Sequence, residues 1–434
     1  MTKLLIINGR VIDPEMKLDK VADILIENGI IKDINPVNPR SEINPANPRS
    51  DAEAIDAKGK LVIPGVIDMH VHLRDFEQSY KETVETGTKA ALKGGVTTVF
   101  TMPNTKPPLD NAETINKYQN IIKNGSAVNT YICGAITIGQ KGKTLADFSS
   151  YKKLGIRFVT DDGSDVNDEA LLEQAYLEAK KNGLIVMTHP EMSSIAPNGV
   201  VNEGAVSRKL GVPGQPNKKE YKAVERGIRI ALKTGARAHF THISTKESVE
   251  LIRKAKKNSD LITCDTTPHH ICLTEDEVIE KGGLAKVNPP LRTEKDRLAL
   301  IKGIKDGTID AIVTDHAPHN MEEKGTNLIK SAFGFSGLEI LIPAILNELY
   351  HRQKIDLMKV VELMTLNPAK IAGLSSGHIQ KGAPADITII DLDSEKKVNR
   401  KEFVSKGKNT PFDGKKLKGW PVMTIYKGIT SQCN

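Results

Sequence analysis

The sequence has little of what several protein classes require. Only four of its 434 residues are cysteines, and they are too scattered to predict a disulfide framework. Aromatic residues make up 4%, which leaves few rings on which nucleic-acid bases could stack. The net charge of +7 is small for this length and indicates no acidic partner.

Long apolar runs are also missing. The longest stretches, residues 309–313 and 338–346, fall far short of the roughly 20 residues that a membrane-spanning helix needs. The N-terminus turns polar at Asn8, too soon for a signal peptide. The 39% of hydrophobic and 26% of charged residues are typical of globular proteins. We therefore expect a cytoplasmic protein that binds neither nucleic acid nor membrane.

Both ends of the chain predict β-structure. Short β-branched runs before residue 60 are separated by Asn-Gly dipeptides at positions 8 and 28, which are typical of hairpin turns. Residues 35–50 repeat Asn-Pro and predict a loop insertion. We expect residues 1–60 and 375–434 to combine in one small composite β-domain.

The middle of the chain, residues 61–374, alternates short apolar strands with helical stretches, the pattern of βα units around a parallel sheet. Eight such repeats predict an α/β fold, a (β/α)8 TIM barrel, and a doubly wound open sheet is the alternative. No GxGxxG follows the first strand, so a dinucleotide-binding fold has no support. The expected strands are 61–67, 96–101, 129–136, 156–160, 184–188, 237–241, 261–265 and 309–314.

Histidine is what the sequence does have, since nine of its eleven histidines lie between His70 and His319. Reacting groups of such barrels follow the carboxyl ends of the strands. His70 and His72 follow the first expected strand and point to the same side of an extended segment, where they can bind one metal ion. Other strands are followed by Asn104, by Asp161 and Asp162, by His189, by His242, by His269 and His270, and by Asp315, His316 and His319.

Core packing gives no reason for imidazoles and carboxylates to recur at that one level of a barrel. This mixture of donors suits Zn²⁺ or another borderline divalent ion better than Ca²⁺ or Mg²⁺, which prefer oxygen alone. Metal-assisted hydrolysis is therefore the reaction class that the residues favour.

Residues 70–74, His-Val-His-Leu-Arg, follow Pro-Gly-Val-Ile-Asp and resemble the metal-binding signature of the amidohydrolase superfamily. Together with further motifs they are similar to the long class of dihydroorotases, in which a barrel carries a β-domain. The resemblance covers nearly the whole chain. These motifs are Met102-Pro103-Asn104-Thr105, Thr160-Asp161-Asp162-Gly163, Thr267-Pro268-His269-His270, Asn288-Pro289-Pro290-Leu291-Arg292 and Thr314-Asp315-His316-Ala317-Pro318-His319.

This resemblance implies a zinc-dependent cyclic amidohydrolase that interconverts dihydroorotate and N-carbamoyl-L-aspartate in pyrimidine biosynthesis. It implies one or two Zn²⁺ ions, with two favoured. Asp315 would accept a proton from the attacking water and pass it to the departing ring nitrogen. The ligands would be His70, His72 and Asp315 for one ion, His189 and His242 for the other, and Asp162 as the bridge, with Asp161 as the alternative bridge.

The same resemblance implies a set of substrate-binding residues. Arg74, Asn104 and His319 would hold the substrate carboxylate, since a guanidinium can clamp a carboxylate through two parallel hydrogen bonds. Residues 75–80 depart from the Glu-Pro-Gly that the family usually has beside this arginine. The full set expected at the substrate is His72, Arg74, Asn104, Asn288, His319, Phe333 and Gly334.

Two other functions compete with this interpretation. A hydantoinase, dihydropyrimidinase or allantoinase would share the metal set but acts on rings without the carboxylate, and has less use for Arg74 and Asn104. A non-catalytic scaffold homologue that binds a transcarbamoylase is disfavoured, because every metal position holds a competent residue. The sequence leaves open a homo-oligomer and an aspartate transcarbamoylase partner.

Overall fold

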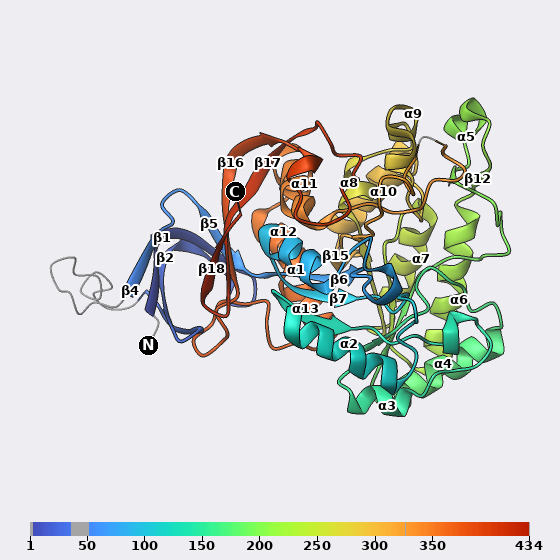
Figure 1. Ribbon diagram of the computed structural model, residues 1–434, viewed down its shortest axis with the longest axis horizontal. Coiled ribbons are helices and arrows are strands. Elements are labelled where there is room, and N and C mark those ends of the chain that lie inside the picture. The colour runs from blue at the N-terminus through green and yellow to red at the C-terminus, as the bar shows by residue number, and fades with distance from the viewer. Residues whose placement is uncertain (1–2, 36–51, 326, 434) are drawn as a thin grey trace.

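The computed structural model describes residues 3–35, 52–325 and 327–433 and consists of a β-sheet beside a barrel (Figure 1). The sheet has eight strands in the order β18-β17-β16-β5-β1-β2-β3, with β4 also paired to β1. Its strands come from both ends of the chain, which confirms the predicted composite β-structure. They are β1 (Lys3–Asp13), β2 (Leu18–Glu27), β3 (Ile30–Ile34), β4 (Ala52–Asp56), β5 (Leu61–Pro64), β16 (Ile387–Lys397), β17 (Lys416–Tyr426) and β18 (Ile429–Gln432).

Of the two Asn-Gly dipeptides, only the second makes the predicted hairpin. Asn28 and Gly29 have φ of 51° and 78° and join β2 to β3 in a tight turn. The first lies inside β1, where the register with β2 shifts between Ile6 and Gly9, so the hairpin prediction is wrong there. The positive φ of Asn8 is part of a β-bulge at this point in the strand. The Asn-Pro insertion lies, but for Asn35, outside the described residues.

Eight parallel strands form the barrel. They fall into a run of three and a run of five, and two single parallel bridges close the ring, Gly134 to Val159 and Val71 to His316. The predicted TIM barrel is confirmed, and the open-sheet alternative is wrong because the ring closes. The strands are β6 (Val66–Val71), β7 (Val96–Thr101), β8 (Asn129–Ile132), β9 (Phe158–Val159), β10 (Ile185–Thr188), β13 (Ala238–Phe240), β14 (Ile262–Thr266) and β15 (Ala311–Ile312).

Helices surround this ring in Figure 1. Several of them begin at a polar residue whose side chain caps the first turn. Thr83, Asp168 and Thr245 accept hydrogen bonds from backbone N–H groups in the first turns of α1, α4 and α7, which explains why those helices begin there. The longer helices are α1 (Val84–Lys93), α2 (Ala112–Gly125), α4 (Glu169–Asn182), α6 (Lys218–Thr234), α7 (Lys246–Lys256), α10 (Glu294–Lys305) and α12 (Leu357–Met364). Shorter elements are α3 (Phe148–Lys153), β11 (Val201–Asn202), α5 (Ala205–Leu210), β12 (Gly214–Gln215), α8 (Pro268–Cys272), α9 (Glu277–Lys281), α11 (Leu341–Ile345) and α13 (Leu366–Ala372).

The first expected barrel strand, residues 61–67, is in fact two strands. Residues 61–64 form β5, which pairs with β1 and β16 in the composite sheet, and the barrel strand β6 starts at Val66. Gly65 lies between them. A larger residue would not fit at this position, because a Cβ there would lie 2.1 Å from Thr97 Oγ1. His70 therefore lies within β6 rather than beyond it. The domain boundaries at residues 60 and 374 stay a prediction.

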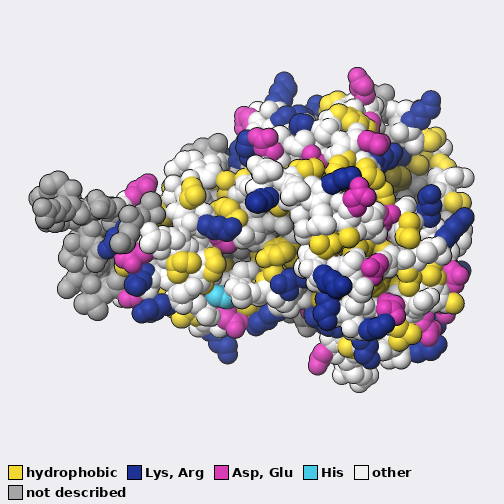
Figure 2. Space-filling model, turned by 60° about the horizontal axis from the view of Figure 1, so that its bottom comes forward, with side chains coloured by type: hydrophobic (Ala, Val, Ile, Leu, Met, Phe, Trp, Pro, Cys, Tyr) yellow, Lys and Arg dark blue, Asp and Glu magenta, His cyan; other side chains and the backbone are white. Residues whose placement is uncertain are grey.

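The surface shows no dominant charge on the face drawn in Figure 2, where Lys and Arg side chains are interspersed with Asp and Glu. Histidine is nearly absent from that face, although the chain contains eleven. Among the described residues, no helix has the length and apolarity needed to cross a membrane.

Gly95 offers a test of how closely the sheet and the barrel pack. Its φ is 86°, and an added Cβ would lie 2.5 Å from Ile342 Cδ1 and 2.8 Å from Thr388 Cγ2. We expect Gly95→Ala to lower the free energy of unfolding by about 3 kcal/mol, through backbone strain and overpacking together. Gly59→Ala should lose only about 1 kcal/mol, because Gly59 has φ of 72° and a Cβ there would meet no atom of a described residue within 4 Å. Equal losses in urea unfolding would contradict this account.

Candidate metal centre

Six side chains from five strand ends meet at one end of the barrel. None is more than 9% exposed, although they are separated by up to 245 positions along the chain. They are His70 in β6, His72 after β6, Asp162 after β9, His189 after β10, His242 after β13 and Asp315 after β15.

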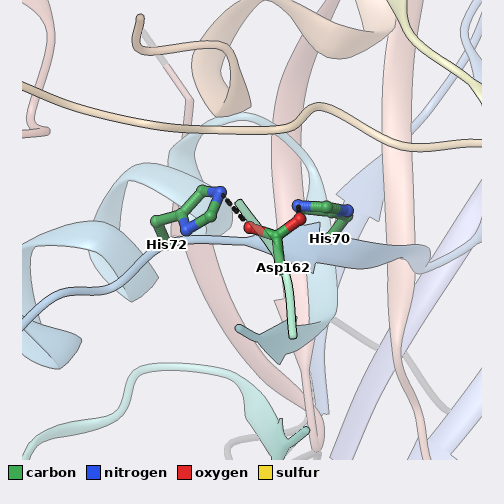
Figure 3. Close-up of side chains that lie close together, drawn as sticks. All are labelled: His70, His72 and Asp162. Carbon is green, nitrogen blue, oxygen red and sulfur yellow. Dashed lines mark ion pairs between the residues drawn. The ribbon is translucent and has the colours of Figure 1, made fainter. Parts of the chain in front are cut away.

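Asp162 lies between His70 and His72, with a carboxylate oxygen facing each ring (Figure 3). His70 Nε2 is 3.3 Å from Asp162 Oδ1, and His72 Nε2 is 3.6 Å from Asp162 Oδ2. Asp315 completes this group, since its Oδ1 lies 3.1 Å from His72 Nε2 and 3.5 Å from His70 Nε2. The two histidines of β6 thus lie between two carboxylates, Asp162 and Asp315.

The second group uses the same carboxylate. Asp162 Oδ1 is 3.4 Å from His189 Nδ1 and 3.9 Å from His242 Nε2, and the two imidazole nitrogens lie 3.0 Å apart. Two ligands that are each about 2.1 Å from a tetrahedral ion lie about 3.4 Å apart. The observed spacings fit metal coordination, with Asp162 common to both groups.

The charges of the site also fit a cation. Among the described residues, Nε2 of His70 and Oδ1 of Asp162 are buried and have no hydrogen-bond partner. Burial lowers the pKa of His70, but the carboxylates of Asp162 and Asp315 outweigh it and raise that pKa to about 9. Although burial opposes this, the surrounding imidazoles hold the pKa values of both carboxyl groups well below their usual range. The site therefore favours positive charge, which a divalent ion would supply in place of these protons.

Three functional candidates have strained backbones. Arg74, His242 and Asp315 have φ of 59°, 41° and 49°, a region that side chains rarely adopt and that costs on the order of 1–3 kcal/mol each. Buried carboxylates hold two of these strand ends. Asp265 Oδ1 accepts the N–H of His242 at 2.5 Å, and Asp68 Oδ1 accepts the N–H of Thr314, beside Asp315, at 3.1 Å.

The neighbouring carboxylate, Asp161, faces away from this cluster. Its Oδ1 accepts the backbone N–H groups of Ile136 and Thr137 at 2.8 and 3.0 Å, and its Oδ2 accepts the Thr137 hydroxyl. Asp161 therefore holds the loop after β8, whereas Asp162 is the one that faces the four histidines.

A cavity of about 340 Å³ lies beside the metal cluster, and every residue predicted for substrate binding lines it. Arg74 is 8% exposed, and within the described part of the chain its Nε has no hydrogen-bond partner. A buried guanidinium with an unpaired N–H favours an anion in the cavity.

His319 also lines the cavity, but both of its nitrogens are engaged. Nε2 donates to the Phe333 carbonyl at 2.8 Å, and Nδ1 lies 3.2 Å from Glu323 Oε2. A substrate carboxylate would have to displace one of these contacts, which the sequence did not indicate.

Sequence reasoning missed three residues around the cavity. Gln78 and Lys81 line it, and Lys81 Nζ lies 2.8 Å from Glu323 Oε1. Lys81 lies just before α1, which begins at Val84. Glu191 contacts His189 Nε2 at 3.0 Å, and its position two residues after a strand-end histidine was the signal available.

Comparisons with known proteins agree with this geometry. Residues 61–430 match the amidohydrolase family. The dihydroorotase of Elusimicrobium minutum is 45% identical over 427 residues, covering 98% of this chain and 96% of that protein. The dihydroorotase of Aquifex aeolicus is 44% identical over 430 residues, covering 99% of each. An L-hydantoinase (dihydropyrimidinase) structure from Arthrobacter aurescens has a TM-score of 0.86 at 25% identity, over 99% of this chain and 96% of that one.

The chain therefore belongs to the amidohydrolase family. Its buried histidine and aspartate cluster is a binding site for a divalent metal ion. Within the family, its sequence groups with the dihydroorotases more closely than with the hydantoinase that shares its fold.

Lys324, behind the cavity wall, gives a test of the burial seen here. It is 2% exposed, and its ammonium donates to the carbonyls of Lys286, Ala332 and Gly334 at 3.1, 2.8 and 2.7 Å. Burial and the nearby Lys286 ammonium lower the pKa of Lys324 to about 7.

Because that pKa is lower in the folded protein, the unfolded chain binds more protons between about pH 7 and 10. Wild-type stability should therefore rise with pH relative to Lys324→Met, by up to about 1.4 kcal/mol per unit. Urea unfolding of both proteins at pH 7 and pH 9 measures the difference. A difference that does not change with pH would contradict the lowered pKa.

Proposed function

We propose that this protein catalyses the reversible hydrolysis of the cyclic amide of dihydroorotate to N-carbamoyl-L-aspartate, the dihydroorotase reaction of pyrimidine biosynthesis. The observation that carries this function is the buried Arg74 beside the metal cluster, in a chain that is 45% identical to a dihydroorotase. The substrate is an anionic ring, so its carboxylate suits the guanidinium while its amide carbonyl can reach the cluster.

We further propose Zn²⁺ as the metal, with two ions. The ligands would be His70, His72 and Asp315 for one, His189 and His242 for the other, and Asp162 between them. Two contacts support this arrangement, since His72 Nδ1 donates to Asn104 Oδ1 at 2.9 Å and His70 Nδ1 donates to Thr241 Oγ1 at 2.9 Å. These donations leave the Nε2 lone pairs of both rings for a metal.

When bound, such ions lower the pKa of a water molecule and polarise the ring carbonyl. Arg74 would bind the substrate carboxylate, and Asn288 with the Phe333 and Gly334 backbone would read the ring amide. Asp315, which lines the cavity, would accept the proton of the attacking water and return it to the departing ring nitrogen. In the reverse direction the same carboxylate would remove the proton from the carbamoyl nitrogen.

The second candidate is a hydantoinase, because the fold matches an L-hydantoinase with a TM-score of 0.86. A ring without a carboxylate would leave the buried Nε–H of Arg74 without a partner among the described residues, which disfavours this candidate. A homo-oligomer, a transcarbamoylase partner and the cytoplasmic location stay predictions.

Substitution of Arg74 tests the substrate. We expect Arg74→Gln to lower kcat/KM for dihydroorotate by about 100- to 1,000-fold, mainly through KM, because a charge-assisted bidentate contact is lost. Arg229→Gln, which removes an exposed pair with Glu169, should leave the kinetics unchanged. An unaltered KM in Arg74→Gln, or wild-type turnover of hydantoin but not of dihydroorotate, would contradict the proposal.

Metal removal and Asp315→Asn test the chemistry. Dialysis against a chelator should abolish turnover, and added Zn²⁺ should restore it. Asp315→Asn should lower kcat by about 100- to 10,000-fold, because an amide cannot relay the proton. Circular dichroism and metal analysis should show a folded variant that retains much of its metal. Near-normal rates in this variant would rule out Asp315 as the proton acceptor.

A further inference from the structure

Glu191 has no role in the mechanism proposed above, although its carboxylate contacts two residues that do, His189 and Asn288. It lies two residues after His189 and accepts a hydrogen bond from His189 Nε2 at 3.0 Å. It also accepts one from Asn288 Nδ2 at 2.5 Å and forms an ion pair with Lys219 Nζ at 2.7 Å. Three donors thus converge on one carboxylate from β10, the segment before α10, and α6.

The carboxylate and its lysine are enclosed. The side chain of Lys219, in the first turn of α6, is 6% exposed and that of Glu191 is 20% exposed. The Glu191 oxygens lie against three donors, one of which is the Lys219 ammonium. Glu191 is therefore a charged acceptor with a fixed direction, whose counter-charge is the Lys219 ammonium.

This contact decides which nitrogen of His189 carries the proton. A neutral imidazole has one N–H donor and one lone pair. Donation from Nε2 to Glu191 leaves the lone pair on Nδ1, the atom that faces Asp162 Oδ1 at 3.4 Å and His242 Nε2 at 3.0 Å. Carboxylates that hold the far nitrogen of a histidine in this way commonly orient it for a metal.

The same carboxylate orients Asn288, which lines the substrate cavity. Since its Nδ2 donates to Glu191, and lies 3.2 Å from His189 Nε2, the amide cannot rotate without losing that short contact. Its Oδ1 is left as the acceptor for a substrate N–H.

We propose that Glu191, braced by Lys219, is a positioning residue that sets the His189 tautomer and the Asn288 amide together, so that metal affinity and substrate affinity are coupled. This inference rests on the proposed function for its substrate, and on the geometry alone for its metal ligand. It assigns a role to three residues that are far apart in sequence and share one hydrogen-bond network.

Glu191→Gln is the main test, because glutamine keeps the size but loses the charge and one acceptor. We expect zinc affinity of the apoprotein, measured by competition with a chromophoric chelator, to weaken about 10- to 100-fold. At saturating zinc, KM for dihydroorotate should rise at least threefold more than kcat falls. In the zinc-loaded protein, nitrogen-15 NMR should show the His189 proton on Nε2, strongly hydrogen-bonded in the wild type and less strongly in the variant.

Lys219→Met keeps the Glu191 carboxylate but removes the ammonium that pairs with it. We expect this variant to show the same changes in zinc affinity, KM and NMR signal, but smaller ones. The matched control is Glu173→Gln, which removes an ion pair with Lys233 on the barrel surface and should change neither zinc affinity nor KM. If Glu191→Gln does not fold, Lys219→Met carries the test with the same three measurements.

Zinc affinity within twofold of wild type and an unchanged Nε2–H signal of His189 would overturn the proposal, even if the variant were less stable, because that result describes a merely structural pair. A change in zinc affinity without a change in KM would overturn the coupling. If the wild type failed to turn over dihydroorotate, the proposed function would fall, whereas the zinc and NMR measurements would still decide the role of Glu191 at the metal ligand.

Discussion

The buried carboxylate of Asp162 is the constraint on which the site depends. Its two oxygens lie 3.3 to 3.9 Å from imidazole nitrogens of four histidines, in a place where water cannot screen the charge. A carboxylate in such surroundings needs compensating positive charge. In the absence of a metal, His70 and His189 supply this charge by binding protons, and their pKa values are raised to about 9 and 10. A bound divalent ion would supply the same positive charge in place of the protons.

Around this cluster, a second set of buried acids fixes the groups that face the metal. Asp68 and Asp265 hold strand ends whose backbones are strained, and Glu191 holds a histidine ring and an amide. Each of these acids accepts at least two hydrogen bonds, which offset part of the cost of its burial. These hydrogen bonds position the groups that face the cavity in the absence of substrate, which is the preorganisation that electrostatic catalysis needs.

Much of the fold and of the site could be predicted from sequence, because the signals are local. Apolar runs gave the strands, and polar residues after each run marked the carboxyl end of the barrel, where the structure places His189 and His242. Errors arose where a local signal has two outcomes. Asn8 and Gly9 form a bulge instead of a turn, since β2 offers Asp23 as a partner for the N–H of Asn8 at 2.9 Å. The division of residues 61–67 into two strands at Gly65 was missed, because it depends on tertiary contacts of Gly65 such as the one with Thr97.

The sequence by itself determined the barrel, the composite sheet and the residue types at each strand end, because periodicity and composition act over a few residues. Tertiary structure alone decided that Asp162 faces the histidines while Asp161 holds a loop, and that both nitrogens of His319 are already engaged. It also brought Glu191, Lys219 and Asn288 to one point. These outcomes depend on how helices and loops distant in the chain pack around a closed ring, and no local pattern records that.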